Sequence, residues 1–220
     1  MTRPARSRAP ARKPPPVIGL LGGVGAGKSL VAAQFAEFGC KVVDADRIGH
    51  ELLSEPAVRR ALRRRFGGAI FDSRGRVNRR RLADAVFDRR DQLRALERIV
   101  HPTLWSRVRQ ALAAARRTRR PAVILDAALI LEKGLDKLCD VMLYIQVPAK
   151  VRRVRAMQAR GWSPSEVSRR EAFQVSLKTK RNRADYVIDN STSPEHTLAQ
   201  VRTILSRVTQ GRVAADGSRR

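Results

Sequence analysis

Cysteines, aromatic side chains and long apolar runs are all scarce in this chain of 220 residues. The two cysteines, Cys40 and Cys139, have no metal-type spacing, so they indicate neither a disulfide framework nor a zinc site and fit a reducing compartment. No stretch approaches the roughly 18 uninterrupted apolar residues of a transmembrane helix, so no membrane association is expected. Hydrophobic residues still make up 43% of the chain and aromatics 5%, which predicts a globular, cytoplasmic protein with a core mainly of Ala, Val, Leu and Ile.

Acidic residues are also few, 20 against 46 Lys and Arg, and the formal net charge is +26. Such a charge is typical of proteins with an anionic partner such as nucleic acid. A compositional bias toward Arg and Ala, with Arg-rich solvated helix faces, is the interpretation we favour, because no nucleic-acid motif accompanies the basic runs. We expect no specific nucleic-acid partner, and a monomer or weak oligomer.

Both ends of the chain are expected to be tails. Residues 1–16 hold five basic side chains and the run Pro14-Pro15-Pro16, which is typical of a disordered basic tail. Residues 209–220 are expected to form a flexible C-terminal tail. One domain of ordinary size then remains, over residues 17–208.

Five short apolar segments within this domain are predicted strands. They cover residues 17–21, 41–45, 122–127, 141–147 and 186–189, and helical patterns separate them. Buried strands that alternate with helices predict an α/β fold, in which helices cover both faces of a parallel sheet.

Two helical segments exceed what a simple alternation of strands and helices needs. Residues 47–120 show mostly amphipathic helix patterns and are expected to form an insertion that grips an acceptor substrate. Residues 149–183 are strongly basic, and their place before the last strand fits a lid over bound phosphates. The rest of the domain, its nucleotide-binding core, then comprises residues 17–46 and 121–208, and the lid lies within the second range.

The first predicted strand leads into the sequence Gly22-Gly23-Val24-Gly25-Ala26-Gly27-Lys28-Ser29, which matches the Walker A pattern G-x-x-x-x-G-K-[ST]. Its glycines allow a tight turn whose N–H groups point at phosphate oxygens, and the following helix adds a favourable partial charge. Lys28 is placed to reach the β- and γ-phosphates of ATP, and the Ser29 hydroxyl to ligate Mg²⁺. We expect nucleotide binding by residues Gly23 to Leu30. The motif alone does not separate a kinase from an ATPase or a GTPase.

Carboxylates follow the second and third predicted strands, whose carboxyl ends face the ligand crevice of a parallel sheet. Strand alternation places Asp44 and Asp46 on the same side. Asp46 is the better candidate for a base that takes the acceptor's proton, and Asp44 for help with Mg²⁺ or positioning. Asp126 ends an apolar strand as a Walker B Asp does, which suggests an indirect contact to Mg²⁺. Helix N-capping by Asp46 and a structural cap at Asp126 are equally good explanations.

Taken together, these motifs resemble the dephospho-CoA kinase family. The resemblance covers residues 17–205, and its points follow the order usual in that family. They are the phosphate loop, Val43-Asp44-Ala45-Asp46, Gly75-Arg76-Val77-Asn78 with the helical pattern up to Phe87, His101-Pro102, the segment from Asp126 to Gly134-Leu135, and Arg183-Ala184-Asp185-Tyr186-Val187-Ile188-Asp189-Asn190. The phosphate loop is generic, whereas the last motif and the spacing of Asp44 and Asp46 are specific.

The resemblance implies transfer of a phosphoryl group from ATP, with Mg²⁺, to the ribose 3′-hydroxyl of dephospho-CoA, the last step of coenzyme A biosynthesis. It implies Asp46 as the catalytic base, Arg155 as a lid arginine on the phosphates, and His101 and Pro102 in the acceptor domain. A guanidinium suits phosphate oxygens well. The alternatives are one more solvated arginine at position 155 and a helix-end histidine packed beside Pro102.

The chain departs from the family at several positions. Leu30 replaces the usual Thr, Ala127-Ala128 replaces Val-Pro, Leu131 replaces Phe, and Ala159 lies where a second lid arginine is common. These departures are expected to affect turnover and the fine geometry of the lid and acceptor pocket, but not the reaction class. Another small-molecule or nucleotide kinase, and a non-catalytic basic P-loop protein that binds nucleic acid, are the alternatives.

Overall fold

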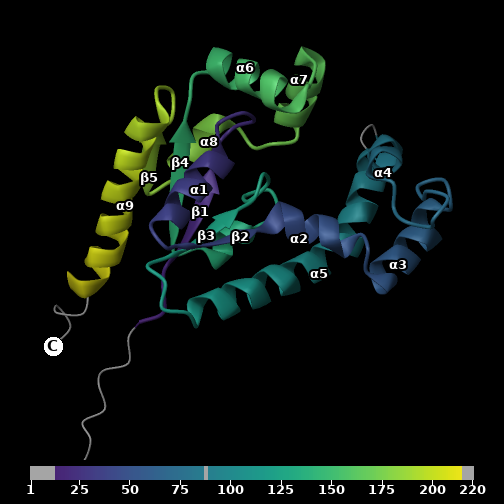
Figure 1. Cartoon of the computed structure of the whole chain (residues 1–220). Helices are drawn as coiled ribbons and strands as arrows, with labels where there is room; N and C mark the ends of the chain where they lie inside the picture. Colours follow the sequence, from purple (N-terminus) through teal and green to yellow (C-terminus); the bar gives the residue numbers. More distant parts are fainter. Residues whose placement is uncertain (1–12, 87–88, 215–220) are drawn as a thin grey trace, which may run out of the picture.

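The computed structural model describes residues 13–86 and 89–214. Its centre is a sheet of five strands, β1 (Val17–Leu21), β2 (Lys41–Asp44), β3 (Val123–Asp126), β4 (Val141–Gln146) and β5 (Tyr186–Asp189). All neighbouring strands are parallel, in the order β2-β3-β1-β4-β5 (Figure 1). The predicted α/β fold with a parallel sheet is confirmed, and each predicted strand agrees with the structure to within one residue at each end.

Strand order places β1 at the centre of the sheet, between β3 and β4. The phosphate loop that follows β1 therefore opens from the middle of the edge at which all the strands have their carboxyl ends. On that edge the register of β2 and β3 pairs Asp44 with Asp126. Two acidic residues from different strands thus reach the same level beside the loop.

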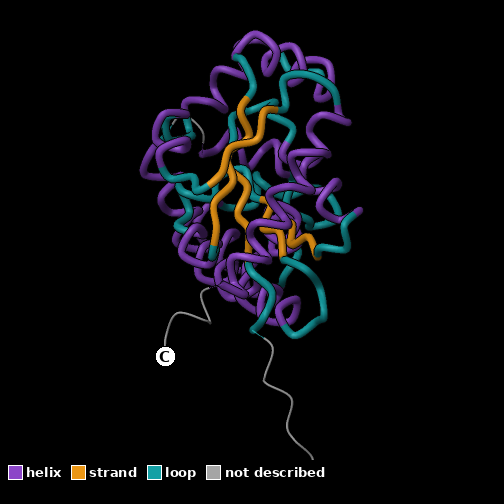
Figure 2. Tube along the Cα trace, turned by 90° about the vertical axis from the view of Figure 1, so that its left-hand side faces the viewer, coloured by secondary structure: helices purple, strands orange, loops and turns teal. Residues whose placement is uncertain are grey.

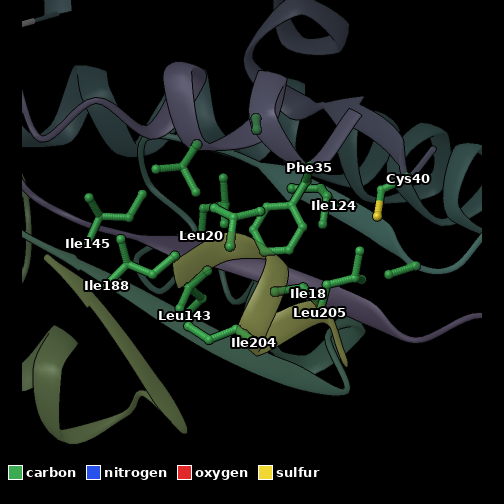
Figure 3. Close-up of a cluster of buried hydrophobic side chains, with 14 of the residues drawn as sticks. Ile18, Leu20, Phe35, Cys40, Ile124, Leu143, Ile145, Ile188, Ile204 and Leu205 are labelled. Atoms are coloured by element: carbon green, nitrogen blue, oxygen red, sulfur yellow. The ribbon is translucent and has the colours of Figure 1, made fainter. Parts of the chain in front are cut away.

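Helices cover both faces of the sheet (Figure 2). On one face lie α1 (Lys28–Glu37) and α9 (Pro194–Ala214), packed over apolar side chains of the strands. Phe35 of α1 is fully buried there, among Leu20 and Ile124 of the sheet and Leu205 of α9 (Figure 3). The other face is covered by α2 (Ala45–Leu52) and by part of α5 (Arg90–Arg116).

A second, smaller core lies in the helical insertion. It consists of residues from α3 (Pro56–Phe66), α4 (Arg79–Val86) and the segment between them, namely Val58, Leu62, Ile70, Phe71, Leu82 and Val86. The long helix α5 joins this cluster to the sheet, as Figure 1 shows. Leu96 and Ile99 in its first half pack against the insertion, whereas Leu104 and Val108 in its second half pack under the sheet.

The middle of α5 contains His101 and Pro102. The hypothesis of a helix-end histidine at this position is therefore wrong. Proline lacks the N–H that a helix interior uses and crowds the preceding turn, so the sequence favours a break here. Packing of the two halves of α5 into two different cores offsets that local cost, and the helix continues.

The segment that was predicted as a lid, and is called the lid below, consists of α6 (Ala149–Arg160), α7 (Pro164–Ala172) and α8 (Leu177–Asn182). A short 3-10 helix, η1 (Leu135–Leu138), precedes β4. Val24 at the tip of the phosphate loop is buried in a small apolar cluster with Ala156, Val167 and Trp162 of the lid. The lid in this structure is packed onto the loop.

The two expected tails fall partly outside the described residues. Residues 1–12 of the expected tail at 1–16 lie there, as do residues 215–220 at the other end. Helix α9 continues to Ala214, six residues beyond the expected end of the domain at residue 208. Within residues 13–86 and 89–214, none of the helices combines the length and apolar character needed to cross a membrane.

Candidate active site

The phosphate loop, residues Gly22–Ser29, turns through two glycines in the left-handed region. Gly25 has φ of 73° and Gly27 has φ of 83°, conformations that other residues adopt only at a cost. A Cβ on Gly25 would collide with the carbonyl oxygen of Arg152, and one on Gly27 with the side-chain amide of Asn190. The glycines therefore permit both the turn itself and the close approach of α6 and of the chain after β5.

Two distant side chains hold the backbone of this loop. The Arg152 Nη1 donates to the Val24 carbonyl at 3.0 Å and lies 2.6 Å from Oε1 of Glu171 in α7. The Asn190 Nδ2 donates to the Ala26 carbonyl at 2.9 Å. Both Arg152 and Asn190 are buried, so solvent does not compete for these hydrogen bonds. These two bonds use carbonyl groups of the loop and none of its N–H groups, of which that of Ala26 donates to the carbonyl of Gly23 at 3.2 Å.

Lys28 is the first residue of α1, and its ammonium rests on the loop. Its Nζ lies 3.5 Å from the carbonyl oxygen of Gly22 and 3.4 Å from that of Gly23. Burial lowers the pKa of Lys28, and the negative charge of Asp126 opposes that shift. A desolvated cation whose hydrogen bonds, among the described residues, go to neutral carbonyls is well placed to exchange them for an anionic phosphate.

Asp44 and Asp46 have different positions from those that the sequence predicted. Strand β2 ends at Asp44, whose Oδ1 accepts the backbone N–H of Arg47 at 2.8 Å and so caps α2. Asp46 lies in the first turn of that helix, and its Oδ2 accepts the backbone N–H of Ala128 at 2.9 Å. The strand-alternation argument and the N-cap interpretation of Asp46 are therefore both wrong, since the cap is Asp44.

Asp126, at the end of β3, connects this acidic group to the phosphate loop. Its Oδ2 lies 3.5 Å from the hydroxyl oxygen of Ser29. Burial raises the pKa of Asp126 to about 6, Asp46 and Asp44 add to the shift, and Lys28 opposes it. The structural-cap alternative has no hydrogen bond among those of the described residues, whereas the contact with Ser29 points toward the nucleotide site.

The Ser29 hydroxyl and the Asp126 carboxylate form a set of hard oxygen donors. Mg²⁺ prefers oxygen ligands, usually keeps several waters, and is commonly held by one or two protein groups together with substrate phosphates. A neutral hydroxyl and a single carboxylate beside a phosphate loop fit an ion of this kind that arrives with the nucleotide.

Arg155 lies one helical turn beyond Arg152 and also turns toward the loop region. Its Nη1 donates to the backbone carbonyl of Asn190 at 2.7 Å, whereas Arg153 is exposed. Asn190 in turn contacts the phosphate loop through its side chain. The structure thus brings Arg155 beside the loop, although its present partner is a carbonyl group.

The two residues predicted for the acceptor domain, His101 and Pro102, lie on α5. The Nε2 of His101 lies 2.9 Å, and the Nε1 of Trp105 3.0 Å, from the carbonyl oxygen of Lys133, in the loop after β3. Beside them is a cavity of about 810 Å³ that is broadly open to solvent. Its lining residues are Arg94, Glu97, Arg98, His101, Pro102 and Trp105.

The structure connects Lys28, Ser29, Asp46 and Asp126 by hydrogen bonds and charge interactions, whereas His101 and Pro102 belong to the separate wall on α5. Sequence analysis missed the residues that hold the loop, above all Arg152 and the buried Lys180. Only Asn190 carried a signal, as a polar residue directly after a buried strand. A phosphate loop with a cation, a hydroxyl and two carboxylates is suited to phosphoryl transfer, and a separate cavity is suited to an acceptor.

Comparisons with known proteins agree with this geometry. The family model described as dephospho-CoA kinase matches residues 16–196. A dephospho-CoA kinase of Symbiobacterium thermophilum is 39% identical over 186 residues, 84% of this chain and 78% of the relative. One of Aquifex aeolicus is 37% identical over 194 residues, 88% and 97% of the two chains. A crystal structure from Thermus thermophilus is 33% identical, with a TM-score of 0.77 over 89% of this chain and 98% of that one. The chain therefore belongs to the dephospho-CoA kinase family.

Proposed function

We propose that this kinase transfers the γ-phosphoryl group of ATP to the ribose 3′-hydroxyl of dephospho-CoA and releases CoA and ADP. This reaction is the last step of coenzyme A biosynthesis. The observation that carries the mechanism is the position of Asp46, on the first turn of a helix that starts at the carboxyl edge of the sheet, within the electrostatic environment of Lys28 and Asp126. In our proposal this carboxylate meets the acceptor hydroxyl where the hydroxyl approaches the γ-phosphate.

Asp46 acts as the general base in this proposal. The N–H of Ala128 fixes its Oδ2, which sets the direction in which the carboxylate points. As the 3′-oxygen forms a bond to the γ-phosphorus, the bond to the bridging oxygen of ADP breaks and ADP leaves with that electron pair. The proton of the hydroxyl passes to Asp46.

Lys28 and Arg155 stabilise the charge on the transferring group. Each is held by carbonyl oxygens in this structure, Lys28 by the loop and Arg155 by Asn190. An anionic phosphate is a stronger partner than a neutral carbonyl, so both cations are expected to turn toward it. Ser29 and, more indirectly, Asp126 would hold Mg²⁺, which would supply positive charge against the phosphates.

The cavity on α5 is our proposed place for the rest of the acceptor. Dephospho-CoA carries a pyrophosphate and a long, partly apolar arm. Arg94 and Arg98 supply cations for the pyrophosphate, and Pro102 and Trp105 supply an apolar wall. His101 keeps this wall in register with the loop after β3, through the carbonyl of Lys133.

An ADP-release assay over a panel of acceptors tests the function. Dephospho-CoA is expected to be preferred over adenosine, shikimate and nucleoside monophosphates by on the order of a hundredfold or more, because only it fills both parts of the site. Phosphorus NMR of the product is expected to show a new 3′-phosphomonoester. Preference for another acceptor would indicate a different kinase, and ADP release with none of them would contradict a catalytic role.

The proposal includes a cytoplasmic monomer or weak oligomer without a specific nucleic-acid partner. The net charge of +26 still predicts weak, sequence-independent binding of nucleic acids at low salt. Such binding is expected to decline steeply toward physiological salt. Tight binding of one defined DNA or RNA at physiological salt would contradict this part of the proposal.

A further inference from the structure

A buried ion pair lies beneath the phosphate loop, outside the groups assigned above. Lys180 of α8 is 1% exposed, although Lys178 and Arg181 beside it are exposed. A buried ammonium is costly unless charged and polar partners surround it. Burial lowers the pKa of Lys180, and the charge of Glu132 opposes the shift. The chain therefore directs one lysine of a basic helix inward and supplies an acid to meet it.

The ammonium of Lys180 contacts three separate segments of the chain. Its Nζ lies 2.8 Å from Oε1 of Gln174, 3.4 Å from the carbonyl oxygen of Gly22 and 3.5 Å from Oε1 of Glu132. Gln174 belongs to the segment by which the lid returns from α7 to α8, Gly22 begins the phosphate loop, and Glu132 lies in the loop after β3. The three hydrogens of one ammonium thus meet three elements of the active site.

Glu132 strengthens the same connection. Its Oε1 also accepts the backbone N–H of Val175 at 2.8 Å, and its side chain is 15% exposed. One carboxylate oxygen therefore binds both Lys180 and the returning segment of the lid.

The carbonyl oxygen of Gly22 faces two ammonium groups, that of Lys180 at 3.4 Å and that of Lys28 at 3.5 Å. Lys180 is fixed from the buried side by its two other partners. Lys28, at the start of α1, is only partly buried by comparison, and it is the one that we expect to move to a phosphate. When it moves, Lys180 still holds the Gly22 peptide.

We infer that Lys180, paired with Glu132, is a positioning residue for phosphoryl transfer. It locks the first peptide of the phosphate loop to the lid and to the loop after β3, so that Lys28 is released toward the γ-phosphate without displacement of the loop. This inference rests on the proposed function, since it concerns the same transfer step. Small displacements of a positioned group are costly for rate, of the order of a hundredfold for about 1 Å.

Substitution of Lys180 by Met tests the inference, because Met keeps the length but removes the charge and the donors. In the folded variant kcat is expected to fall roughly tenfold to a hundredfold. The KM values for ATP and dephospho-CoA are expected to stay within about threefold, since neither substrate touches Lys180 in the proposed arrangement. Lys178→Met, two residues away and exposed, is the matched control and is expected to keep full activity.

Glu132→Gln and the double variant test the pairing. Gln keeps an acceptor for Val175 and Lys180 but removes the charge, so kcat is expected to fall by about threefold or more. The double variant is expected to be no less active than Lys180→Met alone, because it removes the carboxylate that the single change leaves unpaired. If Lys180→Met does not fold, Glu132→Gln tests the inference instead, and a kcat within about twofold of that of the starting protein would overturn it.

A folded Lys180→Met with kcat within about twofold of the starting protein would overturn the inference, as would a loss confined to KM. If the fold-reductions in kcat of the two single variants multiply in the double variant, the two residues act independently and the pairing is overturned. Failure of the unaltered protein and of Lys178→Met to phosphorylate dephospho-CoA would instead contradict the proposed function itself. The two failures are therefore distinguishable.

Discussion

The phosphate loop and the helical insertion, which we propose holds the acceptor, are stabilised differently. Buried side chains from α6, α8 and the chain after β5 hold the carbonyl groups of Gly22, Val24 and Ala26. The insertion joins the sheet through apolar side chains of α2 and α5, and in a solvent-accessible ion pair Arg107 lies 2.8 Å from Glu55. Exposed ion pairs contribute little to stability, whereas buried hydrogen bonds fix geometry. We therefore expect the loop to be a preorganised half of the proposed site and the insertion to be a more adaptable half.

Arginine also has different roles in the two regions. At the loop, Arg152 is buried and paired with Glu171. In the insertion, arginines contact backbone and rings at the surface, as where Arg81 donates to the carbonyl of Phe71 at 2.9 Å and Arg63 lies 4.3 Å above the Phe71 ring. The same residue type therefore fixes a geometry in one region and covers a small core in the other.

The largest expected effect is at the preorganised half. Lys28→Ala is expected to reduce kcat by roughly a thousandfold or more, because the γ-phosphate loses its positioned cation. Steady-state ADP release with dephospho-CoA measures this loss. Lys41→Ala removes an exposed lysine at the start of β2 and is expected to leave activity intact. Near-normal turnover of Lys28→Ala would show that its position on the loop carbonyls has no catalytic consequence.

Asp46→Asn tests the point at which the two regions meet. The change keeps the size of the side chain but removes the proton acceptor, so kcat is expected to fall about a hundredfold or more while ATP binding survives. Calorimetric ATP titration and ADP release separate the two quantities, with the exposed Asp84→Asn as control. Normal transfer by Asp46→Asn would contradict its role as base, and loss of ATP binding would indicate a structural role.

The buried carboxylate of Asp126, in the preorganised half, is expected to lower the stability of the folded protein by an amount that depends on pH. Its pKa in the folded protein, about 6, is raised above the ordinary value of about 4, so the folded state binds the proton more tightly than the unfolded state. Stability without nucleotide is therefore lost as the pH rises from about 4 to about 6. Asp126→Asn is expected to unfold like the parent near pH 4 and to be more stable by about 2 kcal/mol above pH 7.

Chemical denaturation at several pH values measures this difference between Asp126→Asn and its parent. A difference that does not change with pH would show that Asp126 is not strained by burial. The same variant is expected to be a poorer kinase, since it lacks the carboxylate next to Ser29. Greater stability with lower activity would show that the nucleotide site is preorganised at a cost.

The smallest expected effect is at the adaptable half. Arg98→Ala is expected to raise the KM for dephospho-CoA several-fold, about 1 kcal/mol, because an adaptable wall has other cations such as Arg94. The KM for ATP is expected to stay unchanged. Arg109→Ala, an exposed arginine on the same helix, is the control. An equal rise in both KM values would remove the distinction between the two halves.

Local chemistry made much of this architecture predictable. The five strands were readable because fully buried parallel strands are short apolar runs bounded by turn residues. The phosphate loop was readable because its turn needs glycine at fixed positions, such as Gly25 and Gly27. Each of these constraints acts within a few residues of the chain, so the sequence displays it directly.

The roles of Asp44 and Asp46 were only half predictable. The sequence places both acids at the end of β2, and periodicity alone cannot say whether the strand extends by two more residues. The cap made by Asp44 ends the strand, and the N–H of Ala128, far away in sequence, orients Asp46. The resemblance to a known family, rather than the alternation pattern, carried the assignment of Asp46 as the base.

The sequence by itself determined the parallel sheet and the phosphate loop, because periodicity and glycine geometry are local properties, and its resemblance to a known family indicated the reaction class. Only the tertiary structure decided which basic residues are buried, as Arg152 and Lys180 are, and that α5 continues through Pro102. Burial of a charge depends on a partner from elsewhere in the chain, here Glu171 or Glu132, and a proline in a helix is tolerated when packing on both sides offsets its cost. Neither the distant partner of a buried charge nor the packing around a proline can be predicted from the residues adjacent in sequence.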